Sequence, residues 1–167
     1  TVLYTSAGLY SATLTLLYFG WYKGTPMTGF HFINDNDNFL QADKFGHATT
    51  AYTFSNYAHN WLRWAGVNNN KSAVYGSLMG FGSMTVIEIL DGFSAEYGAS
   101  WGDLVANGAG SMLFMSQQLL WKDQRFRLKF SYHPTDMAAY NPELLGKNHL
   151  QRALKDYNGQ TFWLSAN

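Results

Sequence analysis

Cysteine is absent from this chain of 167 residues, and charge is scarce, because Asp, Glu, Lys and Arg make up only 13% of it. The lack of cysteine excludes disulfides and thiolate chemistry, although it fixes no compartment. Basic and acidic residues balance at 11 each, and no basic patch stands out, which argues against a nucleic-acid partner. Ordinary soluble domains carry about 25% charged residues, so the composition already departs from that class.

Two long uncharged segments dominate the rest of the chain, Ser72 to Ile87 and Leu104 to Trp121. They are built mainly from Gly, Ala, Ser, Met and Leu, and each is long enough for a helix. The turn between them carries the acids Glu88, Asp91, Glu96 and Asp103. An apolar hairpin with acids only at its bend indicates either a membrane-spanning pair or the centre of a soluble helical core.

The first segment, Val2 to Tyr22, is also uncharged and reaches the length of roughly 20 residues that a membrane span needs. Trp21 and Tyr22 before Lys23 are typical of a membrane interface. A fully buried helix of a soluble protein is the alternative.

Three further helices are predicted from their caps. Asp37 or Asn38 can cap a helix that reaches about Ala65, and the next helix runs from Lys71 to about Gly92. After a loop over residues 93–100, Ser100 with Asp103 resembles a capping box for a helix that reaches about Lys122. Two pairs of small residues, four apart, are predicted to let helices pack closely: Gly76 with Gly80, and Ala106 with Gly110.

The rest of the chain is less regular. Lys122 to Phe130 alternates charged and apolar residues, as an amphipathic segment or a strand would. Pro142 starts a short helix that Asn158-Gly159 stops, and Gln160 to Asn167 reads as a strand from which we expect the natural chain to continue. We therefore predict an all-α fold, a bundle of four long, Gly-rich apolar helices with an irregular C-terminal extension, divided into residues 1–130 and 131–167.

The charges segregate to the two ends of this four-helix path. One end collects Lys23, Asp35, Asp37, Asp43, Lys44, Glu88, Asp91, Glu96 and Asp103. The other collects Arg63, Lys71, Lys122, Asp123, Arg125, Arg127 and Lys129. Membrane proteins retain Lys and Arg on the cytoplasmic side, whereas a soluble bundle has no need of such segregation. The pattern favours a membrane-associated bundle with lipid as a partner.

The same path brings polar pairs together at the acidic end. Three helices each contribute a pair of residues that shares a helical face: Asp43 with His47, Glu88 with Asp91, and Asp103 with Asn107. Lys44 lies beside the first pair. Ionisable groups at the edge of an apolar bundle are costly unless they pair, bind an ion or line a wet cavity. We therefore predict one polar cluster. The other histidines, His31, His59, His133 and His149, show no ligand spacing, and we expect most of them at the surface or at the membrane interface.

The ordered motifs Asp43-Lys-Phe-Gly-His47, Glu88-Ile-Leu-Asp91 and Ser100-Trp-Gly-Asp103-Leu-Val-Ala-Asn107 resemble the YfiM family of periplasmic lipoproteins of unknown function. They are more distantly similar to VanZ-like membrane proteins. The resemblance covers roughly residues 41–114 and implies a bacterial cell-envelope protein, at the inner membrane or at the periplasmic face of the outer membrane. It implies no reaction. The lipidated cysteine of the lipoprotein members is missing here, so lipid anchoring cannot be carried over from these residues.

Three roles for the cluster remain open. It can be a structural network that holds three helix ends together. It can be a metal site formed by His47, Glu88, Asp91 and Asp103, since paired carboxylates and imidazole bind metals in bundles. It can also be an acid–base site using His47 and Asp103 on a lipid-linked or cell-wall substrate. We favour the first, without a cofactor: a non-catalytic subunit or scaffold that packs against other envelope subunits.

Overall fold

The structure is a computed structural model that describes residues 4, 5, 8, 10–12, 15, 18, 22, 25–37 and 39–166. The helix predicted over residues 2–22 lies largely outside them. The chain divides into two compact units. One consists of Met27–Phe130 with the strand that follows residue 161, and the other of the chain up to Pro26 with Ser131–Thr161.

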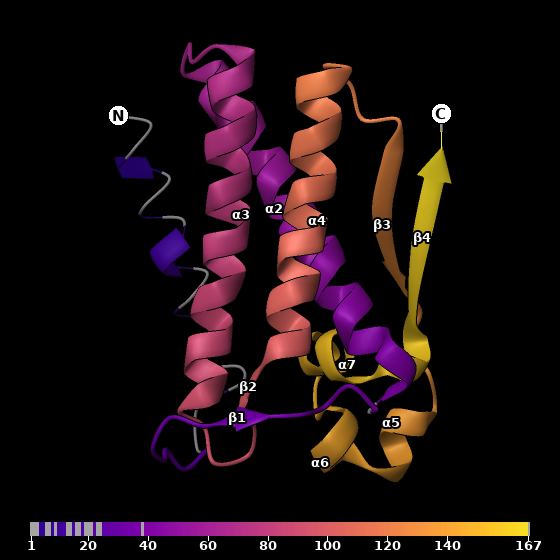
Figure 1. Cartoon of the computed structure of the whole chain (residues 1–167). Helices are drawn as coiled ribbons and strands as arrows, with labels where there is room; N and C mark the ends of the chain where they lie inside the picture. Colours follow the sequence, from indigo (N-terminus) through magenta and orange to yellow (C-terminus); the bar gives the residue numbers. More distant parts are fainter. Residues whose placement is uncertain are drawn as a thin grey trace. The chain divides into compact units, whose positions relative to one another are not determined.

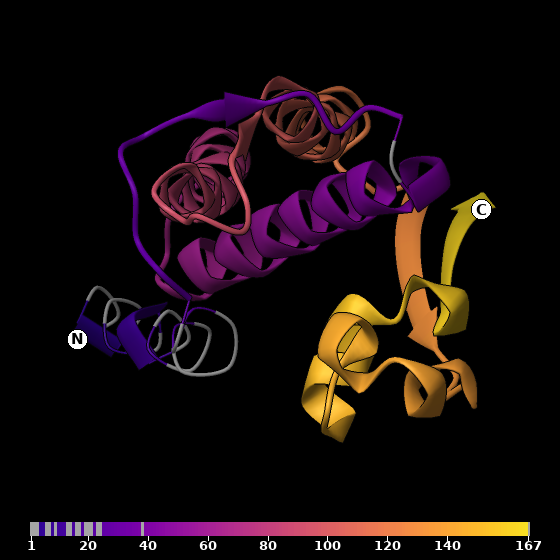
Figure 2. The same ribbon diagram turned by 90° about the horizontal axis from the view of Figure 1, so that it is seen from below.

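Three long helices form the first unit: α2 (Ala42–Trp64), α3 (Asn69–Gly92) and α4 (Trp101–Leu120). Each of them packs against the other two, and α2 crosses α3 and α4 on one side (Figures 1 and 2). The Ser100 hydroxyl accepts a hydrogen bond from the Asp103 N–H at 3.3 Å, so the predicted cap of α4 is confirmed. Asn68 caps α3 in the same way.

The second helix does not begin at the predicted position. A 3-10 turn, η2 (Phe39–Gln41), precedes α2. Gln41 occupies the N-cap position of α2, and its side chain makes no capping hydrogen bond. Leu40 and Gln41 have φ angles of 50° and 65°. These left-handed conformations interrupt the helical path ahead of α2, so Asp37 does not cap this helix. Asn38 lies outside the described residues.

The expectation of an all-α fold is wrong, because two small sheets accompany the helices. β1 (Phe32–Ile33) pairs in parallel with β2 (Ala99–Ser100), Phe32 lying opposite Ala99. β3 (Phe126–Tyr132) and β4 (Gln160–Ala166) form a second two-stranded sheet, with opposite directions in Figure 1. Strand pairing satisfies backbone groups that a loop across the helix ends would otherwise leave open.

Between β3 and β4, the other unit contains short helices: α5 (Met137–Tyr140), α6 (Pro142–Leu145), α7 (His149–Lys155) and the 3-10 turn η3 (Tyr157–Gly159). A single helix from Pro142 was predicted, and this is also wrong. Gly146, at φ 103°, ends α6, and the Asn148 side chain accepts a hydrogen bond from the backbone of Gln151 to start α7. Asp156 is buried and accepts a hydrogen bond from the Thr135 hydroxyl at 2.6 Å.

The three-helix unit buries small and polar residues and exposes large apolar ones. Phe114 is the largest fully buried side chain, and most of its buried neighbours in α2, α3 and α4 carry hydroxyl, amide or carboxyl groups. In contrast, Leu78 is 59% exposed, Met112 63% and Val105 71%. Soluble proteins bury their large aliphatic side chains, so this distribution is the reverse of a soluble core.

Glycine at the helix contacts permits this packing. A Cβ atom placed on Gly76 would lie 2.7 Å from the backbone nitrogen of His59, and one on Gly80 2.7 Å from the carbonyl oxygen of Ala51. A Cβ on Gly110 would overlap the Ala48 carbonyl. Both α3 and α4 therefore approach the α2 backbone at glycines that the sequence singled out.

Candidate functional site

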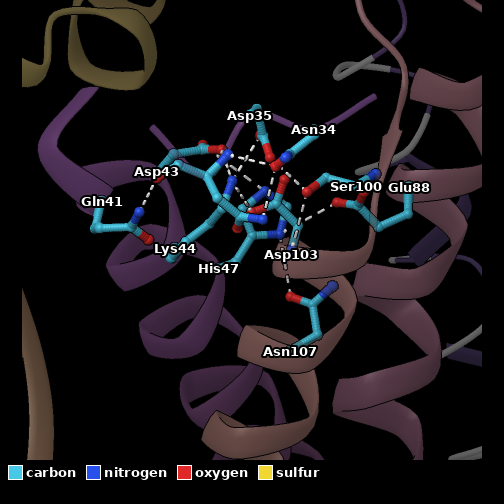
Figure 3. A network of polar contacts seen from close by, with 11 residues as sticks. Asn34, Asp35, Gln41, Asp43, Lys44, His47, Glu88, Ser100, Asp103 and Asn107 are labelled. Atoms are coloured by element: carbon cyan, nitrogen blue, oxygen red, sulfur yellow. Dashed lines mark hydrogen bonds and ion pairs between the residues drawn. The ribbon is translucent and has the colours of Figure 1, made fainter. Parts of the chain in front are cut away.

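The ends of three helices meet at one level of the first unit. The first turns of α2, the last turns of α3 and the first turn of α4 lie together at the bottom of Figure 1. The β1 loop, residues 32–37, runs across the ends of α3 and α4 (Figure 2). Figure 3 shows the polar side chains that this arrangement gathers.

Lys44 is the centre of this cluster. Its Nζ atom lies 2.6 Å from Asp35 Oδ2, 2.9 Å from Asp103 Oδ1 and 3.5 Å from Asp43 Oδ2. Only 12% of the Lys44 side chain is exposed. The three carboxylates come from the β1 loop, α2 and α4, so a single ammonium group joins three elements.

Asp35 is the member that the sequence did not single out. Besides Lys44, it accepts a hydrogen bond from the Ser100 hydroxyl at 2.6 Å. Burial alone would raise the pKa of Asp35, but the hydrogen bonds from Lys44 and Ser100 outweigh it and bring the pKa below its usual value. The pKa direction indicates that Asp35 is held as a carboxylate. In this stretch a local role, that of a helix cap, was predicted only for Asp37 or Asn38, so the role of Asp35 in the cluster was missed.

His47 of α2 contacts both α3 and α4. Its Nδ1 atom lies 3.1 Å from Asn107 Oδ1 and 3.4 Å from Glu88 Oε1, while Nε2 is 3.9 Å from Asp43 Oδ1. With two acceptors facing Nδ1, the tautomer that carries its proton on Nδ1 fits this environment best.

Glu88 is almost completely buried, and its Oε2 atom accepts the backbone N–H of Ser100 at 3.0 Å. Asp91, three residues further along α3, interacts with Glu88 electrostatically and is partly exposed. The structure thus brings Asp43, Lys44, His47, Glu88, Asp103 and Asn107 into one set of direct contacts and places Asp91 at its edge.

A metal ion could be held by part of this set. One ligand atom each from Asp43, His47 and Asp103 lie within 4.8 Å of one another. Carboxylate oxygen and imidazole nitrogen suit Zn²⁺, Mn²⁺ or Fe²⁺. The Lys44 ammonium, however, lies within ion-pair distance of both carboxylates and would compete with a cation for them.

A second polar network, made of uncharged groups, lies toward the other end of the same unit. Gln124 Oε1 accepts hydrogen bonds from the Tyr52 hydroxyl and from Gln117 Nε2, each at 3.1 Å, and Gln124 Nε2 donates to Gln118 Oε1. Gln118 Nε2 donates in turn to Asn69, which is also 3.2 Å from His59 Nε2. His59 is buried, so it is an exception to the expectation that most histidines outside the cluster lie at the surface or at an interface.

Within the described part of the chain, one helix is long and apolar enough to cross a membrane, α3. Only a third of its most apolar window is buried, whereas the core helix of a soluble protein is mostly buried. By itself, one such helix is weak evidence.

The motifs of the cluster lie within a region that matches a known family. No curated protein and no solved structure matches the chain. The family model described as "Predicted periplasmic lipoprotein (DUF2279)" matches residues 31–117, slightly more than half of the chain. This region contains α2, α3 and most of α4, with every residue of the Lys44 cluster. The chain therefore belongs to this family of predicted periplasmic lipoproteins of the bacterial cell envelope.

Proposed function

We propose that the chain is a non-catalytic scaffold subunit of a bacterial envelope assembly, with its three long helices embedded in a membrane. The reversed burial of the three-helix unit carries this proposal. Lipid tails are as apolar as leucine, so large aliphatic side chains can face them while small and polar residues pack between the helices. The exposed faces of α3 and α4 fit lipid and the apolar surfaces of other envelope subunits.

The distribution of charge along the helices supports the same arrangement. The uncharged segment of α3, residues 72–87, spans about 24 Å at about 1.5 Å per residue, close to the roughly 30 Å of a bilayer's hydrocarbon layer. Tryptophans mark its two limits, with Trp101 at the acidic end and Trp64 and Trp121 at the basic end, all at least 40% exposed. Aromatic residues favour the membrane interface.

The geometry of the cluster favours a structural role over a catalytic one. Lys44 takes the place among Asp35, Asp43 and Asp103 that a metal ion or a charged substrate would need. A protein cation in that position neutralises the carboxylates and fixes the β1 loop, α2 and α4 together. The cluster then acts as a clasp at one end of the bundle.

Extraction and sedimentation test the membrane proposal. We expect the chain to stay in the membrane pellet after a carbonate wash, to dissolve only in detergent, and to run in mild detergent as a particle much larger than its 18.8 kDa. A folded monomer that stays in the supernatant of a high-speed spin in plain buffer would contradict it.

An enzyme acting at the cluster is the second candidate, and one observation favours it. The approach of Asp43, His47 and Asp103 to within 4.8 Å is compatible with a metal-dependent or acid–base reaction on a lipid-linked or cell-wall substrate. Lys44 also lines an open hollow of about 470 Å³ beside Trp101, which would give a substrate access.

Asp43→Asn separates the two candidates. Asp43 lies furthest from the Lys44 ammonium of the three carboxylates, so a structural clasp should tolerate the change with a loss of less than about 1 kcal/mol in unfolding free energy. Wild-type protein would then contain no stoichiometric metal by elemental analysis. One equivalent of Zn, Mn or Fe in the wild type that disappears in Asp43→Asn, with an unchanged melting temperature, would favour the enzyme instead.

A further inference from the structure

A pocket of about 310 Å³ lies at the opposite end of the three-helix unit from Lys44. Its walls are the second half of α2, the end of α4, and the turn and strand that follow, where α4 leads into β3 (Figure 1). Small-molecule sites start at about 300 Å³, so the pocket has room for a small polar group.

The charged residues of the lining are mainly cationic. Lys122, Arg127 and Lys129 line the pocket, against one acid, Asp123. The Asp123 carboxylate already accepts the backbone N–H of Gln124 at 2.8 Å. Among the described residues, neither Lys122 nor Lys129 forms an ion pair or a side-chain hydrogen bond. The pocket lining therefore carries an excess of positive charge that no ion pair among the described residues neutralises.

The pocket is also held in shape. The Arg127 Nε–H donates to the Gln124 carbonyl at 3.0 Å, which positions the guanidinium group, and the Gln124 side chain belongs to the buried amide network. On the α2 side, Asn56 and Asn60 line the same space and Asn60 Nδ2 donates to Asn56 Oδ1 at 3.3 Å. Preorganised donors lose less conformational freedom when a ligand binds.

We propose that this pocket binds a phosphate group, either that of a lipid headgroup or free phosphate. Arginine and lysine with neutral amide donors are the groups that recognise phosphate in proteins. A carboxylate ligand needs fewer donors, and a cation would be repelled. The proposal goes beyond the scaffold role and does not depend on it, because the pocket is defined by its own residues. If the helices do lie in a membrane, this end is the one at which lipid phosphates would meet basic residues.

Two double variants with equal charge loss test the proposal on the full chain in non-ionic detergent. Lys122→Gln/Lys129→Gln removes two pocket cations. Lys71→Gln/Arg125→Gln removes two cations that do not line the pocket; Arg125 lies over the Trp121 ring instead. Each protein is melted and analysed by native mass spectrometry with dioleoyl phosphatidylglycerol, with dioleoylglycerol, which has the same tails and no phosphate, and with sodium phosphate against sodium chloride of equal ionic strength.

We expect a phosphate-bearing probe to bind the wild type and the Lys71/Arg125 variant alike, and the Lys122/Lys129 variant about tenfold more weakly or worse, as the loss of a charge-assisted bond predicts. Binding of phosphatidylglycerol alone identifies a lipid headgroup, and equal binding of sodium phosphate identifies free phosphate. Equal weakening of both variants would show general electrostatic attraction and overturn the proposal. The proposal would also be overturned if phosphatidylglycerol bound no better than dioleoylglycerol and sodium phosphate no better than sodium chloride.

Melting in dioleoylglycerol checks that the pocket variant is folded. If it is not, Lys129→Glu, on exposed β3, replaces it and should reduce binding at least as strongly. Unchanged binding in a folded Lys129→Glu protein would equally overturn the proposal.

Discussion

At the scale of single residues, the cluster depends on Lys44 more than on any of its acids. Each carboxylate has one contact with the ammonium, whereas Lys44 has three such contacts. Asp103 is nearly buried, and Lys44 is the ion-pair partner of its Oδ1 atom. Removing the lysine therefore leaves a buried charge without compensation, which costs more than an intact ion pair contributes.

Lys44→Met should lower the free energy of unfolding by about 3–5 kcal/mol, because methionine preserves the aliphatic packing and removes only the charge. Adding Asp103→Asn should restore part of this loss, since the neutral amide no longer needs a cation. Chemical unfolding of the two single variants and the double variant in one detergent measures the coupling. Additive effects of the two changes would contradict a direct interaction.

Asp35 makes the stability of the cluster depend on pH in the acidic range. Because its pKa is lower in the folded chain than the usual 3.8, its contribution to stability is complete above that value and is lost as the pH falls through the folded pKa. Asp35→Asn should therefore be less stable than the wild type by about 1–2 kcal/mol at neutral pH. Melting curves from pH 7 to pH 2 should show this gap closing only below pH 3.8. A constant gap down to pH 2 would mean that the carboxylate charge contributes nothing.

At the scale of helices, the glycines of α3 divide into contacting and free positions. A Cβ on Gly80 would lie against the α2 backbone, whereas one on Gly82 would have no atom within 4 Å. Alanine stabilises a helix by roughly 0.5–1 kcal/mol relative to glycine. Overpacking at a close contact has the opposite sign and costs about 1–3 kcal/mol.

Gly82→Ala should therefore raise the melting temperature, and Gly80→Ala should lower it. Gly110, against the Ala48 carbonyl, and Gly108, whose nearest neighbour would be Phe81 at 3.9 Å, form the equivalent pair on α4. Thermal melts of the four alanine variants make the comparison. If both members of a pair shift in the same direction, the helices do not meet at these glycines.

Helix caps and residue spacing explain how much of this arrangement the sequence could predict. Ser100 and Asp103 are three positions apart, so a local rule captures their bond, and the topology of three helix ends brings Asp43, His47 and Glu88 to one level. The bond between Ser100 and Asp35 joins residues 65 positions apart, and that between Tyr52 and Gln124 joins residues 72 apart. No local pattern encodes either pair. The pairing of β1 with β2 was missed for the same reason, whereas the strand predicted from Gln160 is confirmed as β4.

At the scale of the whole chain, the composition of the long helices and the burial of their residues differ in how apolar they make these helices. By composition and length, only α3 qualifies as a membrane span among the described residues, because polar and charged residues lower the hydropathy of α2 and α4. The structure shows that many of these polar residues lie between the helices, and that Leu78 and Met112 face outward. The outward-facing surface of the helices is therefore more apolar than their average composition.

Single cysteines can test this outward face, because the 167 residues contain no cysteine that would add a background thiol. Leu78→Cys and Met112→Cys place a thiol near the middle of α3 and α4, at positions 59% and 63% exposed, and Lys71→Cys places one at the exposed basic end. In lipid vesicles, we expect a membrane-impermeant maleimide to modify the first two at least about tenfold more slowly than the third, since an apolar environment raises a thiol's pKa and suppresses the reactive thiolate. Buried Ser77→Cys serves as the unreactive reference. If water instead covers these faces, Leu78→Cys and Met112→Cys will react as fast as Lys71→Cys, and the three helices form a bundle outside the membrane.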